Sequence, residues 1–151
     1  MAENRNLRDV SASTRIRIDK DGHWFYENSE IIHPTILKLF CDSLEIDDHG
    51  RYRIIVENEL CYIDVEDAPY IVRIIHGDCE CGLELFLNNL HTEPLNPETL
   101  FFGNDNIMYA RLANGIVVKF SRAAYYQLAL MMEEKEAGSI CLTVKGKSYP
   151  F

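Results

Sequence analysis

Apolar and polar residues alternate over several short stretches of this chain, and two longer stretches instead repeat apolar residues at helical spacing. The first alternating stretch places Ile16 and Ile18 between charged residues, and Asp21-Gly22 then precedes the aromatic run Trp24–Tyr26. Two such runs around a glycine are typical of a β-hairpin, because glycine readily adopts the positive φ of a tight turn. We therefore expect a hairpin over residues 16–26.

An amphipathic helix is predicted to follow Pro34, because proline suits the first helical position, where an N–H would be unpaired. The apolar stripe of this helix consists of Ile36, Leu37, Phe40 and Leu44. The polar run at 47–50 ends in glycine and predicts the helix terminus, and the alternating residues 52–56 predict a returning strand.

Three further alternating runs, at 60–65, 70–76 and 83–87, predict the strands of an antiparallel meander. Residues 88–106 are rich in Asn, Pro and Gly around an apolar Leu100-Phe101-Phe102, which predicts a long connection between subdomains. We expect a flexible arm over residues 1–14, an N-terminal subdomain over residues 15–90 and a C-terminal subdomain over residues 91–151, in one compact unit.

The C-terminal stretch repeats the order of elements that the first stretch predicts. Strands are expected at 107–112 and 116–120, followed by a helix that Ser121 caps, and by a strand at 140–144. The helix carries one apolar stripe, formed by Ala124, Tyr125, Leu128, Met131 and Met132. Pro34 to Gly50 and Arg122 to Gly138 are equally long, which favours a duplicated hairpin-helix-strand unit, although such units also recur by chance. The predicted fold class is α+β, with two helices and mainly antiparallel strands.

Composition is consistent with a protein that folds on its own in a reducing cytoplasm. With 151 residues and 47% hydrophobic content, the chain can bury a core without metal or disulfide staples. Its five cysteines are odd in number and scattered, which argues against a disulfide framework. The sequence contains no apolar run long enough for a membrane span, and its first fourteen residues do not resemble a signal peptide.

The net charge of −9 is distributed unevenly along the chain. Residues 21–106 carry four basic and eighteen acidic groups, whereas the segments on either side have a net positive charge. An acidic surface disfavours nucleic acid as a partner, because lysine and arginine supply the non-specific affinity for phosphate. The acidic segment is either a solvated face that maintains solubility or one side of an internal interface with the basic segments.

Several motifs together resemble a family of bacterial proteins called domain of unknown function 1285 (DUF1285). They are Asp21-Gly22, Trp24-Phe25, Pro34, Leu39-Phe40, Gly50, Tyr52, the string Val65-Glu66-Asp67-Ala68-Pro69-Tyr70, Arg122, Tyr125-Tyr126 and Leu128. Residues 55–59, Ile-Val-Glu-Asn-Glu, depart from the Thr-Pro-Val-Glu-like string usual in the family. The resemblance implies a duplicated core, a C-terminal half similar to pleckstrin-homology barrels, and a cleft between the halves for a nucleotide-like ligand in signalling.

Glu66 and Asp67, between two predicted strands, form the first candidate site. Paired acids there could act as acid and base, coordinate a cation or accept hydrogen bonds from a ligand. The alternative is a turn in which Asp67 bonds the backbone and Pro69 fixes φ.

A second candidate, a zinc site, is formed by His76, Cys79, Cys81 and His91. The Cys-x-Cys spacing is poor for zinc, since zinc sites typically pair Cys-x-x-Cys with a second ligand pair. Exposed loop thiols are the alternative, and we expect neither a metal nor a cofactor.

Aromatic residues provide a third candidate. Trp24 and Tyr125 are core residues in one interpretation. If the two halves enclose a cleft, either ring could stack on a planar base, while Arg122 at a helix start meets a phosphate.

The sequence lacks a phosphate-binding Gly-rich loop with Lys, a Gly-x-Ser-x-Gly elbow and a helical His-Glu-x-x-His, so the standard enzyme classes lose weight. The leading hypothesis is a ligand-sensing or adaptor protein in bacterial signalling that binds a nucleotide-like molecule between its subdomains. Its candidate ligand-binding residues are Trp24, Glu66, Asp67, Arg122 and Tyr125. The alternatives are a protein-interaction module, with a partner or a second copy, and an acid-base hydrolase that uses Glu66 and Asp67.

Overall fold

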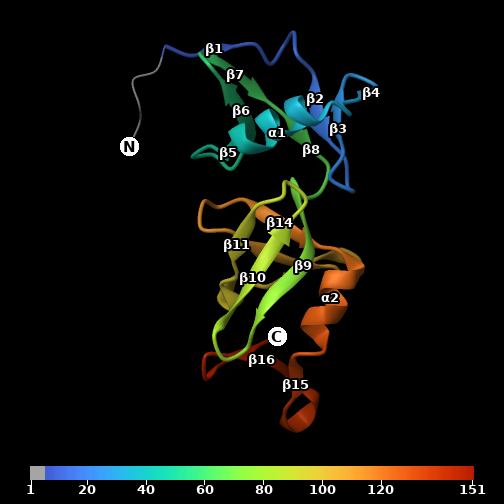
Figure 1. Ribbon diagram of the computed structural model, residues 1–151, viewed down its shortest axis with the longest axis vertical. Helices are drawn as coiled ribbons and strands as arrows, with labels where there is room; N and C mark the ends of the chain where they lie inside the picture. The colour runs from blue at the N-terminus through green and yellow to red at the C-terminus, as the bar shows by residue number, and fades with distance from the viewer. Residues whose placement is uncertain (1–5) are drawn as a thin grey trace. The chain divides into compact units, whose positions relative to one another are not determined.

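The computed structural model describes residues 6–151 and divides the chain into two compact units, which we call unit 1 and unit 2 (Figure 1). Unit 1 extends to Pro69 and unit 2 comprises Tyr70–Phe151. The predicted fold class is confirmed, because the described residues form two α-helices and sheets whose strands are mostly antiparallel. The division lies at Pro69 and not near residue 90, because the strand that begins at Tyr70 pairs with strands of the C-terminal half.

Unit 1 consists of one helix and two four-stranded sheets, with the strand orders β4-β3-β2-β8 and β1-β7-β6-β5. Its elements are β1 (Arg8–Asp9), β2 (Ile16–Ile18), β3 (Trp24–Tyr26), β4 (Ser29–Glu30), α1 (Pro34–Ser43), β5 (Leu44–Ile46), β6 (Tyr52–Val56), β7 (Glu59–Tyr62) and β8 (Asp64–Val65). The predicted hairpin is confirmed, since Ile16 pairs with Tyr26 and Gly22 has φ 82° in the turn.

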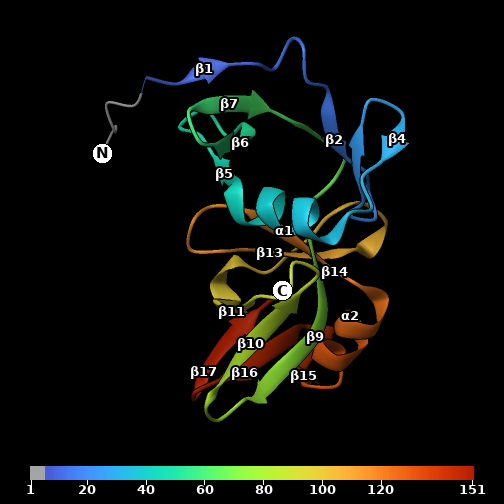
Figure 2. The same cartoon turned by 45° about the horizontal axis from the view of Figure 1, so that its top comes forward.

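The N-terminal segment, where a flexible arm was expected, contains a two-residue strand. Arg8 and Asp9 pair in parallel with Glu59 and Leu60, which makes β1 an edge strand beside β7 (Figure 2). The segment has few apolar residues, and it pairs with β7 through backbone hydrogen bonds. Its flexibility stays a prediction. The first five residues of the expected arm lie outside the described residues.

The first helix is shorter than predicted. It begins at Pro34 as expected, but it ends at Ser43, and Leu44 already has the extended conformation of β5. Leu44 matches the helical spacing, yet its side chain is buried as the cross-strand partner of Ile54. The sheet therefore overrides the local helical pattern.

Unit 2 consists of one helix, a six-stranded sheet in the order β11-β10-β9-β14-β13-β12 and a three-stranded sheet in the order β15-β16-β17. Its strands are β9 (Tyr70–Asp78), β10 (Gly82–Leu87), β11 (Thr92–Pro94), β12 (Phe101–Phe102), β13 (Met108–Arg111), β14 (Val117–Phe120), β15 (Met132–Glu134), β16 (Ile140–Val144) and β17 (Lys147–Pro150). The helix α2 is Arg122–Ala129, and short 3₁₀ turns lie at Pro97–Thr99, Asn104–Asn106 and Glu136–Gly138.

The predicted meander is only partly correct. Strands β9 and β10 form the expected antiparallel pair, but the other neighbour of β9 is β14, which runs parallel to it. The expected connection at 88–106 contains β11, β12 and two of the 3₁₀ turns. These pairings join residues far apart in sequence, which local alternation does not reveal.

The second helix also ends earlier than its apolar stripe suggests. Ser121 caps its start, because its Oγ accepts a hydrogen bond of 3.1 Å from the backbone N–H of Ala124. The helix ends at Ala129, and Met132 is the first residue of β15. Gln127 connects the helix to β9, since its Oε1 accepts a hydrogen bond of 3.0 Å from the N–H of Ile75.

The two units repeat one arrangement of a helix followed by three antiparallel strands. In α1-β5-β6-β7 and α2-β15-β16-β17, a shift of 88 positions (44 to 132) carries the pair Leu44–Ile54 onto Met132–Leu142. The same shift carries Val56–Glu59 onto Val144–Lys147 at the hairpin ends. The two units therefore share the register of their cross-strand pairs as well as the order of their elements. The pleckstrin-homology likeness of the C-terminal part stays a prediction.

Each unit buries its own apolar side chains. In unit 1 the buried residues include Ile16, Ile18, Trp24, Ile54 and Cys61, and in unit 2 they include Val72, Leu85, Val118, Leu128 and Leu142. Each fully buried large aliphatic side chain contributes about 1.5–3 kcal/mol. Within the described residues, no helix is long and apolar enough to cross a membrane.

Candidate functional site

Four aromatic side chains and one arginine lie together on unit 2, and we call them the aromatic-arginine surface. They are Phe102, Arg122, Tyr125, Tyr126 and Phe151. The ring of Phe102 meets Tyr125 edge-on at 6.1 Å and Phe151 at 6.2 Å between centroids, and Tyr125 lies 6.1 Å from Tyr126. Edge-to-face pairs at such distances are mutually favourable.

Helix α2 supplies three of these five residues because of its two-sided pattern. Ala124 and Leu128 are fully buried on one side of the helix, Arg122 and Tyr126 lie on the exposed side, and Tyr125 lies at the border and is partly buried. Phe102 comes from the edge strand β12. Gly103 follows it, and a Cβ at that position would lie 2.4 Å from the ring of Tyr109, so the chain requires glycine there.

The exposed fractions show that this surface is accessible. They are 54% for Tyr126, 42% for Phe102 and 38% for Phe151. Arg122 is exposed as well, and its hydrogen bond to the Tyr126 hydroxyl raises its pKa. The arrangement therefore offers aromatic rings for stacking or apolar contact beside a permanently positive guanidinium group.

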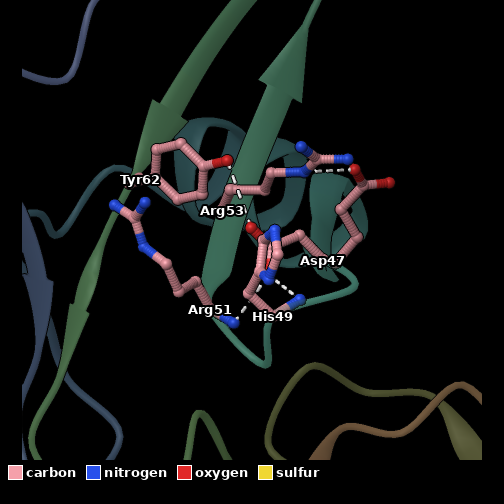
Figure 3. Close-up of polar contacts among 6 residues, drawn as sticks. Asp47, His49, Arg51, Arg53 and Tyr62 are labelled. Atoms are coloured by element: carbon pink, nitrogen blue, oxygen red, sulfur yellow. Dashed lines mark hydrogen bonds and ion pairs between the residues drawn. The ribbon is translucent and has the colours of Figure 1, made fainter.

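A polar cluster lies on the meander of unit 1 (Figure 3). Glu45, Arg53 and Tyr62 are cross-strand neighbours on β5, β6 and β7. The Nε of Arg53 donates to Glu45 Oε1 at 2.7 Å, and the Tyr62 hydroxyl donates to Asp47 Oδ2 at 3.1 Å. The guanidinium carbon of Arg51 lies 3.6 Å from the centre of the Tyr62 ring. The cluster thus connects all three strands of the meander.

The titration of this cluster follows from its contacts. Backbone hydrogen bonds from Arg51 and His49, together with the Tyr62 hydroxyl, hold the pKa of Asp47 below its usual value (Figure 3). Burial alone would lower the pKa of Arg53, but its hydrogen bonds to Glu45 and Tyr62 outweigh burial and raise it. The charged groups form hydrogen bonds with neighbouring groups of the cluster, so the cluster stabilises the β5-β6 turn.

The comparison with known families concerns unit 1. Residues 8–68 match the family model described as the N-terminal domain of DUF1285, a domain of unknown function. Unit 1 is therefore similar to the DUF1285 N-terminal domain. The match ends next to Pro69, where the structure divides the chain. The resemblance stated from the sequence is confirmed.

Two solved structures of DUF1285 family proteins share this fold. The protein from Silicibacter pomeroyi DSS-3 has a TM-score of 0.78 and 21% identity, and the match covers 97% of this chain and 84% of that one. The protein from Shewanella baltica OS155 has a TM-score of 0.68 and 23% identity, over 80% of this chain and 94% of that one. At these identities the likeness establishes the fold alone. No curated protein matches the chain.

Trp24 lies in the core of unit 1. Its side chain is only 2% exposed, and its ring packs 5.8 Å from that of Phe40. This burial favours the core interpretation, since a ring enclosed in this way leaves no face on which a base could stack.

Glu66 and Asp67 lie in the bend between β8 and β9, at the end of unit 1. Glu66 is exposed, its carboxylate accepts a hydrogen bond of 3.0 Å from the N–H of Lys20, and its own N–H donates to the carbonyl of Ile18. These contacts connect Glu66 to the end of β2, and the turn alternative for Asp67 and Pro69 stays a prediction. The acid-base hypothesis for the two carboxylates stays a prediction.

The thiols near the β9-β10 turn follow the loop alternative. Cys81 is exposed, and Asp78 Oδ1 accepts hydrogen bonds from the N–H groups of Glu80 and Cys81. Nowhere in residues 6–151 do three or more His, Cys, Asp or Glu side chains gather as a metal site would need. Cys79 lies in the same turn and is partly buried, and the role of the two thiols stays a prediction.

Of the five predicted ligand-binding residues, Arg122 and Tyr125 lie together in unit 2, whereas Trp24, Glu66 and Asp67 belong to unit 1. Sequence reasoning missed Phe102 and Phe151, because it placed the run Leu100–Phe102 in a connection between subdomains and assigned no role to Phe151. Leu100 is buried, whereas Phe102 is exposed. Strict alternation of faces would have placed Phe102 with the buried Leu100, so no local signal revealed its exposure on the edge strand β12.

Proposed function

We propose that this protein is an adaptor module that binds a partner protein through the aromatic-arginine surface of unit 2. One observation carries the proposal: Arg122 and Tyr125 share a surface with three further aromatic rings whose side chains are 38–54% exposed. These rings are Phe102, Tyr126 and Phe151. Contiguous exposed apolar surface is a mark of interaction sites.

The composition of the surface supports a protein partner. Aromatic residues and arginine are enriched among the residues that dominate binding energy at protein interfaces. Small-molecule sites instead enclose most of the ligand, typically 70–90% of its area. Rings as open as Tyr126 and Phe102 fit the broad contact of a partner protein better than an enclosed ligand.

The proposal is tested by quantitative affinity capture with matched variants. Tyr126→Ala and Phe102→Ala remove exposed rings from the surface, and Tyr26→Ala is the control, since Tyr26 is 46% exposed in unit 1. We expect specific partners to be lost with the first two variants and retained with the third. Capture that is identical for all three would refute the proposal. The elution volume at several concentrations shows whether the partner is a second copy.

A nucleotide-like ligand in bacterial signalling is the second candidate for the same surface. Arg122 and Tyr125 project from one helix, so a base could stack on an aromatic ring while a phosphate meets the guanidinium group. In a thermal-shift screen, a ligand at 100 times its Kd adds about 2.7 kcal/mol to stability. Nucleotides that raise the Tm of the parent but not of Arg122→Ala would favour this candidate over a protein partner.

The acid-base hydrolase is the least favoured function, because the exposed carboxylate of Glu66 already accepts a hydrogen bond from the backbone N–H of Lys20. Substrate screens with the variants Glu66→Gln and Asp67→Asn test it. Turnover that both variants abolish would support it.

A further inference from the structure

The repeated meanders of the two units differ at one outer edge. In unit 1 the outer edge of β7 is covered by the parallel strand β1, whereas in unit 2 the equivalent strand β17 is the last of its sheet (Figure 2). An uncovered strand edge presents backbone groups that can pair with another chain. The β1–β7 pair of unit 1 is therefore an example, within the same molecule, of a parallel strand that such an edge can bind.

Strand β1 is held on β7 by the backbone. The N–H of Arg8 donates to the carbonyl of Asn58 at 2.8 Å, and the N–H of Val10 donates to the carbonyl of Leu60 at 2.9 Å. Arg8 Nη2 also lies 3.6 Å from Glu59 Oε2, which sets one charge pair across the two strands. The pairing thus has a defined register and a defined charge complement.

The shift of 88 positions identifies the equivalent groups in unit 2. Glu59 corresponds to Lys147 and Leu60 to Ser148. Glu59 and Lys147 are both exposed, whereas Leu60 is 7% exposed next to β1 and its equivalent Ser148 is exposed. The burial of this second pair therefore agrees with a covered edge in unit 1 and an open edge in unit 2.

We infer that the outer edge of β17 binds an extended segment of a partner protein, in parallel orientation, with an acidic residue opposite Lys147. This inference rests on the proposed adaptor function and specifies the kind of partner. Backbone hydrogen bonds along an added strand supply affinity, and side chains at alternate positions supply specificity.

The charge of Lys147 favours one kind of segment at the edge of β17. A second copy's β1 would place its Arg8 opposite Lys147, where the like charges repel, so the arm of another copy is disfavoured. An acidic residue would instead reproduce the Arg8–Glu59 pair with reversed signs. Lys147 Nζ is 2.8 Å from Glu98 Oε1, but both side chains are more than 60% exposed, and pairs of this kind are weak enough to exchange.

The edge also leads toward the aromatic-arginine surface. Strand β17 ends at Pro150, and the next residue, Phe151, contacts Phe102 with its ring. A segment that runs parallel to β17 therefore extends toward these rings after its acidic residue. The partner segment should carry an apolar residue there.

Two synthetic peptides test the inference on the full chain. The first has the sequence of residues 7–13, Leu-Arg-Asp-Val-Ser-Ala-Ser, and the second differs only by Arg8→Glu, which suits Lys147 and is repelled by Glu59. Each is titrated to millimolar concentration against ¹⁵N-labelled protein. We expect the Glu peptide to shift the amide signals of Lys147 and Ser148 and to bind there more tightly than the Arg peptide, about two- to fivefold for an exposed ion pair.

Two protein variants sharpen the result. Lys147→Glu should invert the preference between the peptides, whereas the matched control Lys145→Glu, which changes the same charge in the preceding turn, should leave it in place. The inference is overturned if β17 amides do not respond to the Glu peptide, or if Lys147→Glu leaves the preference unchanged.

The outcome is separable from that of the proposed function. Partners lost with Tyr126→Ala, combined with unresponsive β17 amides, would preserve the adaptor function and overturn strand addition. Responsive β17 amides without any partner that depends on Tyr126 would support strand addition and refute the aromatic-arginine surface.

Discussion

The side chain of Gln127 pairs with the backbone of β9 at Ile75, as a neighbouring strand would. Removing this side chain should lower the free energy of unfolding measurably. Its Oε1 accepts a hydrogen bond of 3.0 Å from the N–H of Ile75, and its Nε2 lies 3.5 Å from the carbonyl of the same residue. Ile75 is only 5% exposed, so water has little access to its backbone. The variant Gln127→Met keeps the length of the side chain and removes both contacts.

The expected cost follows from the unpaired N–H. Leaving a buried donor without a partner costs about 1–3 kcal/mol, and this exceeds the loss of an ordinary exposed hydrogen bond. For a domain the size of unit 2, each 1 kcal/mol corresponds to a decrease in Tm of roughly 4–8 °C. Urea unfolding and thermal melting of the full chain measure both quantities.

Hydrogen exchange distinguishes the lost hydrogen bond from a loss of packing. In Gln127→Met we expect the Ile75 amide to exchange faster than the decrease in global stability explains. Gln127→Glu is the matched control, because its carboxylate can still accept from the Ile75 N–H but cannot donate to the carbonyl. Unchanged stability and unchanged Ile75 protection in Gln127→Met would refute the reasoning.

Three further predictions concern unit 1. Trp24→Ala should lower stability by about 3–5 kcal/mol in urea unfolding, because it opens a cavity against Phe40. Burial raises the pKa of the Cys41 thiol to about 11, so iodoacetamide at pH 8 should modify Cys41 more slowly than the exposed Cys81, as mass spectrometry would show. The hydrogen bonds that lower the pKa of Asp47 stabilise the fold above its usual pKa, and this contribution is lost as the pH falls through the lower value in the folded state. The stability advantage of the parent over Asp47→Asn should therefore shrink in urea titrations from pH 6 toward about pH 2.

Local pattern was sufficient for the short-range parts of the fold. The hairpin around Gly22, the start of α1 at Pro34 and the Ser121 cap each depend on residues within a few positions of one another, and the structure has all three. Long-range pairings such as β1 with β7 depend on backbone groups that any residue supplies, so side-chain patterns did not reveal them.

The candidate site was predicted in part for the same reason. Arg122 and Tyr125 lie on one helix, and helical periodicity alone places them near each other. Phe102 and Phe151 reach them only through the tertiary fold, from an edge strand and from the chain end. Trp24 carries the type of side chain that binds planar ligands, but residue type does not distinguish a core ring from an exposed one.

The same misprediction occurred at the end of both helices, and its recurrence is informative. Leu44 and Met132 each continue the apolar spacing of the preceding helix, yet each is the first residue of a strand that pairs with a residue ten positions later. Because the same error recurs at equivalent positions, the two units share one local structure. In each, the last apolar residue that continues the helical spacing belongs to the following strand. The two meanders are therefore equal in their internal register and differ in what covers their outer edge. Leu60 is buried beside β1, whereas its equivalent Ser148 is exposed on β17. This difference is why we infer that a partner strand pairs with the edge of unit 2.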